Sequence, residues 1–446
     1  MQIYKFGGTS LGNADNLRAV KNIVDDGRQK IIVLSANGKV TDHLVSIMNH
    51  LDTKNFGAAF SEKEKLYQYY LTLTEELFKD SETLAAVQHY IYIALIDIQS
   101  KFDQVISARD RNQIISKGEI ISTNLCSMFF DKQSISNTRL FAPDIVVKAA
   151  DGQVDHNLTY RNMKQWLLEN NQPTLIITQG FICSDHHGNI DNLGRGGSDY
   201  SASIFGQITN ASLIQIWSDV DGFLNNDPAC VSNTSPLEHL SFDEAAELAY
   251  FGARILHPTT LLPAKQARIP VLLKNTLNPK AKGTIISDIK QEGGIKAIAA
   301  KDNITSITIH SGRMLLAYGF LKKIFEVFET NQTPVDMVTT SEVSVSVTID
   351  NTERLENILS ELLKMGEVDY STDQSIICVV GDSLTEKQGY VASIFSKIDG
   401  IPIGMISYGA AKNSITFLVD TNNKIEVLQS LQTLLPAFST KTLQHA

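Results

Sequence analysis

The chain has 446 residues, more than a single hydrophobic core usually accommodates, so two or three domains are expected. Hydrophobic residues make up 43% of the chain and charged residues 20%, which is ordinary for a soluble globular protein. The formal net charge of −10 argues against a nucleic acid or an anionic membrane as the main partner, so a small anionic substrate would need locally placed cations.

Short β-rich runs alternate with helical patterns through residues 1–290. Several of these runs are almost continuously apolar, as expected of strands that are buried on both faces. The predicted strands are Ile3–Phe6, Ile31–Ser35, Thr174–Gly180, Leu213–Trp217 and Val271–Lys274. Helical patterns separate them, including Ala14–Asp26 and Asp199–Thr209, and a helical stretch between Lys54 and Asp110 predicts a cap beside the sheet. This alternation predicts an α/β domain with a mostly parallel central sheet between helical layers.

The C-terminal part of the chain repeats a βαββα pattern twice, with a period of about 70 residues that is too long for a solenoid. The first copy is predicted as Ile304–His310, Gly319–Thr330, Val335–Thr340, Val343–Asp350 and Thr352–Met365. The second copy is predicted as Ser375–Val380, Lys387–Lys397, Ile401–Ser407, Ser414–Asp420 and Asn423–Leu434. Two small α+β modules are therefore expected at residues 300–370 and 371–446, and strand sharing between them is left open. The polar, glycine-bearing link Ser287–Gly294 is typical of a domain boundary.

The cysteines and the start of the chain indicate a reducing compartment. Four cysteines lie far apart, at positions 126, 183, 230 and 378, and none forms a CxxC pair, so no zinc site is expected. The first residues, MQIYKFGGTS, lack the pattern of a signal peptide, and no apolar run approaches the ~20 residues of a membrane span. We therefore expect a cytoplasmic protein with no membrane partner.

The first motif that indicates chemistry is Lys5-Phe6-Gly7-Gly8-Thr9-Ser10, directly after a predicted strand. Two successive glycines let the backbone approach a ligand closely, and their N–H groups are able to face phosphate oxygens. Lys5 would neutralise a transferring phosphoryl group. Neither a Walker A loop nor a GxGxxG dinucleotide fingerprint occurs in the chain. The alternative is an ordinary strand-to-helix turn.

The second motif, Gly194-Arg195-Gly196-Gly197-Ser198-Asp199, opens a predicted helix. Ser198 or Asp199 is a suitable N-cap, and a glycine-rich approach to a helix N-terminus is typical of an anion site. Arg195 adds a planar fork suited to a carboxylate. The alternative is a surface turn with a routine cap.

Three further motifs are weaker taken singly. Glu119, in Ser116-Lys117-Gly118-Glu119, could bind a substrate ammonium or be structural. Asp219, in Ser218–Gly222 after an apolar strand, could accept ribose hydrogen bonds or help to hold magnesium, or form a simple Asp-Gly turn. The segment Phe251–Pro258 contains His257. A lone histidine of this kind is more often packed and hydrogen-bonded than catalytic.

The order of these motifs is more specific than any one of them. KFGGTS, VLSANGKVTD, SKGE, GRGGSDYSA, SDVDG, FGARILHP and LLKNTLNP together resemble the aspartate kinase family of the amino-acid kinase superfamily. Val335–Asp350 and Ile406–Gly409 resemble that family's paired ACT regulatory modules, so the resemblance covers essentially the whole chain. It implies an amino-acid-kinase fold that transfers the γ-phosphoryl group of ATP to the side-chain carboxylate of L-aspartate. The product would be 4-phospho-L-aspartate, the first intermediate of lysine, threonine and methionine biosynthesis.

The resemblance also implies roles for single residues. Lys5 and Asp199 are implied as catalytic residues, with Asp199 ordering the lysine and the substrate loop. The implied site for ATP and Mg²⁺ comprises Lys5, Gly7, Gly8, Ser218, Asp219, Phe223, Arg254 and Lys274. The implied aspartate site comprises Thr41, Glu119, Arg195, Gly196, Gly197 and Ser198. Two positions depart from the family pattern, because Arg254 stands where lysine is usual and Ala229 stands where arginine is usual.

A phosphoryl transfer to aspartate fits the residues without further catalytic groups. It needs positioning and charge neutralisation more than covalent help, and the β-carboxylate is already ionised at pH 7, so no general base is required. Arg195 would hold the α-carboxylate and Glu119 the α-ammonium. The alternatives are a related kinase for glutamate, acetylglutamate, carbamate or UMP, and a catalytically silent amino-acid sensor, which intact Lys5 and Asp199 disfavour.

The regulatory ligand expected from the resemblance is L-lysine. The implied effector residues are Met314, Tyr318, Phe320, Leu321, Asp336, Ser341 and Glu342. Asp336 and Glu342 would take the two ammonium groups of lysine, whereas threonine would leave one acid unpaired. A homodimer or higher assembly through the ACT modules is expected. No fused homoserine dehydrogenase is expected. The oligomeric state, the kinetic order and the effector's identity are not fixed by the sequence.

Overall fold

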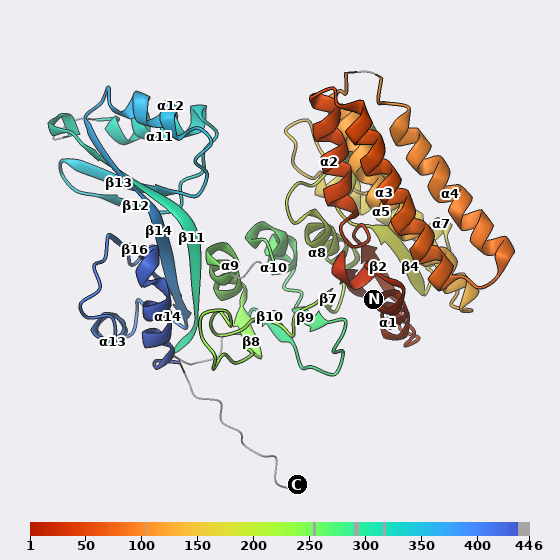
Figure 1. Ribbon diagram of the computed structural model, residues 1–446. Helices are drawn as coiled ribbons and strands as arrows, with labels where there is room; N and C mark the ends of the chain where they lie inside the picture. Colours follow the sequence, from red (N-terminus) through yellow and green to blue (C-terminus); the bar gives the residue numbers. More distant parts are fainter. Residues whose placement is uncertain (104, 253–255, 290–293, 315–317, 436–446) are drawn as a thin grey trace, which may run out of the picture. The chain divides into compact units, whose positions relative to one another are not determined.

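The computed structural model describes residues 1–446 except 104, 253–255, 290–293, 315–317 and 436–446 (Figure 1). The chain divides into two compact units. The first unit comprises Met1–Phe223, Glu238–Phe242 and Leu256–Ile289, and the second comprises Leu224–Leu237, Asp243–Ile255 and Lys290–Ala446. The end of the first unit lies one residue before the boundary expected at residue 290. Two segments inside the expected catalytic domain, 224–237 and 243–255, instead group with the second unit.

The first unit is built on an eight-stranded, mostly parallel sheet with the order β3-β4-β2-β1-β7-β9-β10-β8. The strands are β1 Gln2–Phe6, β2 Lys30–Leu34, β3 Thr138–Leu140, β4 Leu175–Gln179, β7 Ile214–Ser218, β8 His239–Ser241, β9 Val271–Asn275 and β10 Thr284–Ser287. β9 and β10 pair antiparallel. All five strands predicted from continuous apolar runs are present. The three others have only three or four residues, too short to show a pattern.

The central strand β1 separates two faces of this sheet. Tyr4 and Phe6 pack with Trp217 in the core that also holds α1 (Ala14–Val24). Lys5 points to the other face, where α8 (Gly197–Thr209) lies. Because side chains alternate along a strand, β1 contributes apolar residues to the core on one face and a charged residue, Lys5, on the other.

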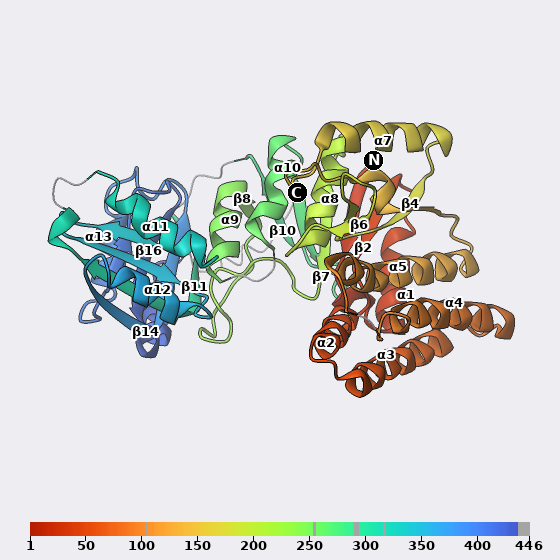
Figure 2. The same ribbon diagram turned by 90° about the horizontal axis from the view of Figure 1, so that it is seen from above.

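A helical cap covers part of the sheet, and it extends on both sides beyond the stretch predicted between Lys54 and Asp110. It consists of α2 Val40–Asp52, α3 Phe56–Leu77, α4 Ser81–Gln99 and α5 Ala108–Lys132, which lie side by side in Figures 1 and 2. The side chains of Asn55, Asp80 and Ser107 accept hydrogen bonds from the first turns of α3, α4 and α5. These N-caps explain where one long helical pattern breaks into separate helices. Shorter elements of this unit are η1 Thr9–Leu11, α6 Ala142–Ile145, α7 His156–Glu169, β5 Ile182–Ser184, β6 Ile190–Asn192, η2 Pro258–Leu261 and α10 Leu262–Gln266.

The second unit contains a six-stranded antiparallel sheet with the order β12-β13-β11-β14-β16-β15. Its strands are β11 Ile295–His310, β12 Val338–Thr340, β13 Ser344–Ile349, β14 Glu367–Gly381, β15 Met405–Ser407 and β16 Ser414–Asp420. Its helices are α11 Phe320–Thr330, α12 Leu355–Leu362, α13 Tyr390–Ser396 and α14 Lys424–Gln432, and η4 Thr421–Asn423 precedes the last. The helix α9 (Phe242–Phe251) begins in the first unit and continues in the second. A short η3 (Gly312–Met314) follows β11.

Two long strands run through both predicted modules. The end of β11, Ile304–His310, lies between β13 and the start of β14, and these strands enclose one apolar core. The beginning of β11, Ile295–Lys301, pairs with Ile376–Gly381 beside β16 and borders a second core. The second module therefore uses a segment, Ile295–Lys301, that comes before the first module's strands in the chain. The sequence did not reveal the first half of β11 because it is rich in alanine, a poor strand former.

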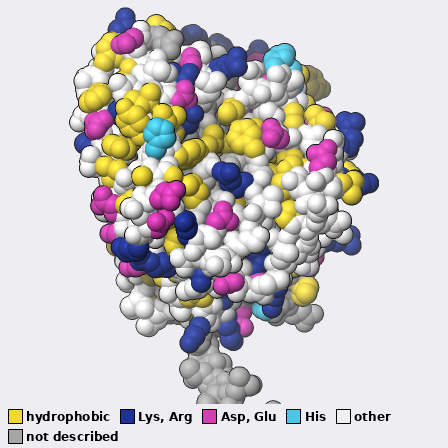
Figure 3. Space-filling model, turned by 90° about the vertical axis from the view of Figure 1, so that its right-hand side faces the viewer, with side chains coloured by type: hydrophobic (Ala, Val, Ile, Leu, Met, Phe, Trp, Pro, Cys, Tyr) yellow, Lys and Arg dark blue, Asp and Glu magenta, His cyan; other side chains and the backbone are white. Residues whose placement is uncertain are grey.

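One face of the molecule mixes charges of both signs (Figure 3). On the face drawn in Figure 3, lysine, arginine, aspartate and glutamate side chains are interspersed among apolar groups. In the part of the chain that the structure describes, no helix is long and apolar enough to cross a membrane.

Candidate active site

The turn after β1 is held by backbone contacts that only glycine permits. The N–H of Gly7 donates to the carbonyl of Trp217 at 3.1 Å, and the N–H of Gly38 donates to the carbonyl of Gly8 at 2.9 Å. A Cβ atom on Gly8 would lie 2.8 Å from the carbonyl oxygen of Gly38, so no other residue fits there. The Nζ atom of Lys5 lies 2.7 Å from Oδ1 of Asp199.

The loop before α8 is also shaped by glycine. Gly196 has φ of 69° and caps the helix, so α8 begins at Gly197, earlier than the predicted caps Ser198 and Asp199. A Cβ on Gly196 would lie 2.8 Å from Cγ2 of Thr260. Asp199 consequently falls in the first turn, where its carboxylate is stabilised by the helix and paired with Lys5.

Arg195 and Ser198 flank this turn. Arg195 is exposed, and its guanidinium forms no hydrogen bond or ion pair with any residue that the structure describes. Ser198 packs closely on Gly180, the residue that follows β4. A Cβ atom on Gly180 would lie 2.7 Å from the Cβ atom of Ser198. The loop thus presents one unpaired cation beside a tightly fixed backbone.

Glu119 is a buried carboxylate with one unsatisfied oxygen. It lies in the middle of α5, is 4% exposed, and its Oε1 accepts a hydrogen bond from the N–H of Ala36 at 3.3 Å. Its Oε2 has no partner among the described residues, and burial raises the pKa of Glu119 to about 8. A Cβ on Gly118 would lie 2.8 Å from that of Ala36, which explains the glycine. Thr41 is half-buried in the first turn of α2, which packs against α5.

The ends of β7 and β9 form the third part of the site. The N–H of Thr276 donates to the carbonyl of Ser218 at 2.9 Å. The side-chain amide of Asn275 donates to Oδ1 of Asp221 at 2.8 Å and to the carbonyl of Asp219 at 3.3 Å. The side chain of Asp219 is exposed. Asn275 was not predicted as a site residue, although its position directly after an apolar strand was a usable signal.

Two predicted nucleotide residues, Phe223 and Lys274, are not brought to the Lys5 face as free side chains. Phe223 is fully buried. Lys274 donates to the carbonyl of Ala281 and lies over the ring of Trp217, and burial lowers its pKa. Arg254 lies outside the described residues. Within those residues, no group of three or more His, Cys, Asp or Glu side chains is placed to hold a metal ion.

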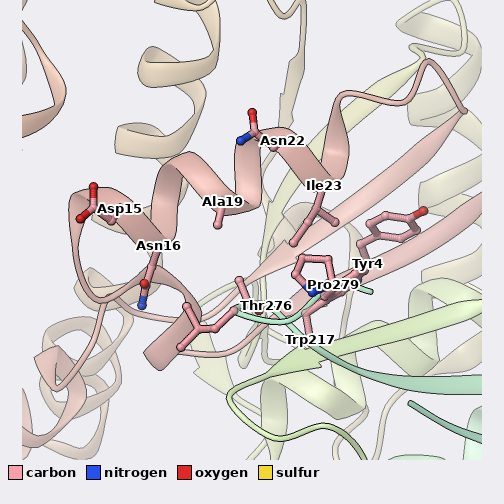
Figure 4. A pocket seen from close by; sticks show the side chains of 10 residues that line it. Tyr4, Asp15, Asn16, Ala19, Asn22, Ile23, Trp217, Thr276 and Pro279 are labelled. Carbon is pink, nitrogen blue, oxygen red and sulfur yellow. The ribbon is translucent and has the colours of Figure 1, made fainter. Parts of the chain in front are cut away.

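A surface pocket of about 520 Å³ lies on the other face of the sheet. Figure 4 shows it between α1, which contributes Ala19 and Ile23, and the aromatic rings of Tyr4 and Trp217. Because Lys5 faces α8 instead, this pocket is separate from the Lys5–Asp199 pair.

The predicted effector residues fall into three environments. Met314 and Phe320 pack on the apolar core of the first module. The exposed members are Tyr318, Leu321, Ser341 and Glu342. Asp336 has a side chain only 1% exposed, and its Oδ1 accepts hydrogen bonds from Tyr250 and, at 2.8 Å, from Lys301. Lys301 also lies 2.9 Å from Asp350, so Asp336 belongs to a compact charged cluster.

Comparisons with known proteins agree with this architecture. Residues 1–275 match the family model described as the amino acid kinase family, and residues 377–435 match a model for an ACT domain. The chain is 30% identical to lysine-sensitive aspartokinase 3 of Escherichia coli (strain K12), over 96% of this chain and 98% of that protein. It is 32% identical to chloroplastic aspartokinase 1 of Arabidopsis thaliana, over 96% of this chain and 79% of that protein.

Solved structures extend the match to three dimensions. The crystal structure of E. coli aspartokinase III in complex with aspartate and ADP (R-state) aligns with a TM-score of 0.86 at 30% identity, covering 97% of this chain and 99% of that one. The same enzyme in complex with lysine and aspartate (T-state) aligns with a TM-score of 0.83, covering 98% of this chain and 99% of that one.

The fold and the arrangement of Lys5, Asp199 and the glycine loops define a phosphotransferase of the amino acid kinase class, with ACT modules attached. This confirms the predicted fold class and the predicted class of enzyme, a kinase with a carboxyl group as acceptor. Within that class, the chain belongs to the aspartokinase family.

Proposed function

We propose that this chain phosphorylates the β-carboxylate of L-aspartate at the edge of the first sheet, where β1, β2 and β7 end. The observation that carries the proposal is Glu119. A buried carboxylate with a free oxygen is costly unless a ligand cation completes it, and the α-ammonium of an amino acid is such a cation. Arg195, which is exposed and without a described partner, would hold the α-carboxylate as a planar fork.

The nucleotide is assigned to the β1 turn and the β7–β9 edge. The solved complex of the E. coli relative with aspartate and ADP supports the use of a nucleotide by this fold. Lys5 would neutralise the transferring phosphoryl group, while the N–H groups after Gly7 would face the phosphates. Mg²⁺ bound to the ATP phosphates would supply further charge neutralisation. No cluster of three metal-binding side chains exists among the described residues, so the phosphates and at most one or two carboxylates such as Asp219 would hold it.

The chemical step needs positioning rather than proton transfer. An ionised β-carboxylate oxygen attacks the γ-phosphorus, a new P–O bond forms, and ADP leaves as the bond to its β-phosphate oxygen breaks. Asp199 orders Lys5 through the 2.7 Å ion pair, which keeps the ammonium at the end of β1. Glu119 and Arg195 hold the two α-substituents of the substrate, so that the β-carboxylate is the group left to react.

Feedback inhibition by L-lysine is the second part of the proposal. The lysine-sensitive relative and its solved complex with lysine and aspartate favour this effector. We assign lysine to the first ACT module, near Asp336, Ser341 and Glu342. Oδ1 of Asp336 already pairs with Lys301, so an effector ammonium at that oxygen would compete with an ammonium of the chain itself, while Oδ2 has no partner among the described residues. Assembly through the ACT modules is part of the same proposal.

A coupled assay of ADP release tests both parts. We expect turnover with L-aspartate and none above background with glutamate, acetylglutamate, carbamate or UMP. At sub-saturating aspartate, lysine should inhibit, whereas threonine and methionine should not. Turnover with another acceptor, or none with any, would contradict the assignment of the substrate. Inhibition by threonine alone would overturn the effector but leave the kinase intact.

A further inference from the structure

Two neighbouring tyrosines of the helical cap reach the loops of the proposed active site. Tyr69 and Tyr70 lie in α3, and their rings meet edge to face with centroids 5.2 Å apart. The hydroxyl of Tyr69 donates to the carbonyl of Gly12 at 2.9 Å. The hydroxyl of Tyr70 donates to Oδ1 of Asn37 at 3.4 Å. One helix therefore contacts both the loop after β1 and the loop after β2.

These two loops also bind each other. The side-chain amide of Asn37 donates to the carbonyl of Leu11 at 2.9 Å, and the N–H of Gly38 donates to the carbonyl of Gly8 at 2.9 Å. A Cβ on Gly38 would lie 3.3 Å from the Tyr69 hydroxyl and 3.4 Å from Cα of Gly12. A side chain at position 38 would therefore press on both the Tyr69 hydroxyl and the backbone of Gly12, so the junction leaves little room for one.

Neither hydroxyl is suited to acid–base chemistry. Tyr70 and Asn37 are fully buried, and burial raises the pKa of both Tyr69 and Tyr70 far above the usual value for tyrosine. Both hydroxyls consequently remain protonated donors over the whole physiological pH range. Their contribution is a fixed hydrogen bond to each loop.

The two loops serve different halves of the reaction. The loop after β1 carries Gly7 and Gly8, which the proposed nucleotide site uses. The loop after β2 carries Ala36, whose N–H holds Oε1 of Glu119, the proposed ligand of the substrate ammonium. The distance between the phosphate donors and the bound aspartate therefore depends on how these loops are joined.

We propose that Tyr69 and Tyr70 are positioning residues that clamp the phosphate loop, Gly8–Gly12, against the loop Ala36–Gly38 and so set the spacing between nucleotide and aspartate. The clamp acts through backbone groups and Asn37, and neither tyrosine touches a substrate. This inference rests on the proposed function, because it takes the phosphate and aspartate contacts from it.

The test compares hydroxyl deletions in the full-length enzyme. Tyr69→Phe, Tyr70→Phe and the double variant are matched with Tyr67→Phe, a deletion on the same helix, whose hydroxyl has no described partner. Binding of ADP and of adenosine is measured by calorimetry, together with kcat, KM for each substrate and thermal unfolding. Because adenosine has no phosphates, it reports on the nucleoside part of the site alone.

We expect each single variant to bind ADP about threefold to tenfold more weakly, the factor that corresponds to one lost hydrogen bond. Adenosine binding should stay within about twofold of the parent, kcat should fall with KM for aspartate little changed, and Tyr67→Phe should match the parent throughout. Backbone hydrogen exchange in residues 8–12 and 36–38 should be faster in Tyr69→Phe and Tyr70→Phe but not in Tyr67→Phe. This measurement reports on the two loops even if a variant is less stable as a whole.

Equal losses for ADP and adenosine would mean general loosening of the domain and would overturn the clamp. So would parent-like ADP binding and kcat in the double variant. Lys5→Met separates this inference from the proposed function. If Lys5→Met retains activity and ADP affinity, the phosphate site itself is misassigned. If Lys5→Met is impaired while the tyrosine variants are not, the site stands and only the clamp is wrong.

Discussion

Glu119 in the first unit and Asp336 in the second are both almost fully buried carboxylates, but their surroundings differ. Glu119 has one oxygen on a backbone N–H and the other without a described partner. Asp336 has a lysine ammonium and a tyrosine hydroxyl on Oδ1, while its Oδ2, like Oε2 of Glu119, has no partner among the described residues. The difference is that Asp336 already pairs with a cation, Lys301, whereas Glu119 forms no ion pair with any residue that the structure describes. Under the proposed function, the substrate ammonium would be the first cation beside Glu119, whereas an effector ammonium at Oδ1 of Asp336 would displace Lys301.

This difference fits the two tasks. A catalytic site gains from groups that are fixed before the substrate arrives, because reorganisation at the moment of reaction is avoided. A regulatory site gains from two alternative arrangements of similar free energy, because a ligand shifts an equilibrium only through its different affinity for the two states. The Lys301–Asp336 pair is a candidate for one of these arrangements, and a lysine-bound Asp336 for the other.

The largest effect is expected for Lys5→Met. Loss of the ammonium at the end of β1 should lower kcat by roughly 10²–10³, the scale for one preorganised charge stabiliser. Circular dichroism and thermal unfolding serve as controls for folding, since Asp199 loses its ion pair as well. A kcat close to that of the parent would remove Lys5 from the mechanism.

The next largest effects concern recognition of aspartate. Glu119→Ala and Arg195→Ala should each weaken apparent aspartate binding by about 2–4 kcal/mol, because each leaves a charged group of the substrate without a partner. KM for ATP should change much less. If KM for aspartate and KM for ATP rise equally in a variant, the substituted residue supports the fold and does not bind the substrate specifically.

The exchange of partners at Asp336 is tested by Lys301→Met and Glu342→Ala. Without Lys301, the effector ammonium no longer competes for Asp336, and lysine should inhibit at about tenfold lower concentration, within the usual coupling of ~1–3 kcal/mol. Glu342→Ala should act in the opposite direction. Lys301→Arg keeps the charge and is the matched control. A lysine titration at sub-saturating aspartate that is identical for Lys301→Met and the parent would show that Asp336 does not exchange partners.

A smaller effect is expected from pH. The pKa of Glu119 is raised to about 8 in the ligand-free protein, so below that pH the group is largely protonated. The substrate ammonium favours the ionised form, and binding therefore releases a proton. Apparent affinity for aspartate should rise with pH by at most about tenfold per unit up to about pH 8, and then level off. In Glu119→Gln this dependence should disappear, and a parent-like slope in that variant would assign it to another group.

Much of the fold was predictable from the sequence because buried parallel strands are continuously apolar, as in Ile31–Leu34, or nearly so, as in Ile214–Trp217 with its single polar residue Gln215. Short edge strands such as β3 and β8 were missed because three residues show no period. The alanine-rich start of β11 was missed because its β structure is imposed by the pairing with β14. Local patterns are informative only where the local sequence decides the conformation.

The candidate site shows the same limit. Lys5 and Asp199 were singled out from the glycines around them, and they form an ion pair in the structure. Lys274 was also singled out, but its side chain turns to Ala281 and Trp217, a direction that no sequence pattern records. Tyr70 was not considered, because the contact with Asn37 joins a helix to a loop 33 positions away.

The strands shared by the two ACT modules restrict how this region can be divided. β11 and β14 each supply a segment to both apolar cores. A fragment that begins at residue 371 would lack Ile295–Lys301, and the unpaired edge of β14 would be open to association with other chains. A gene recombination that joined the two modules from different ancestors at that point would separate strands that must pair. An exchange of the second module that kept its sheet intact would therefore have to carry Ile295–Lys301 with it.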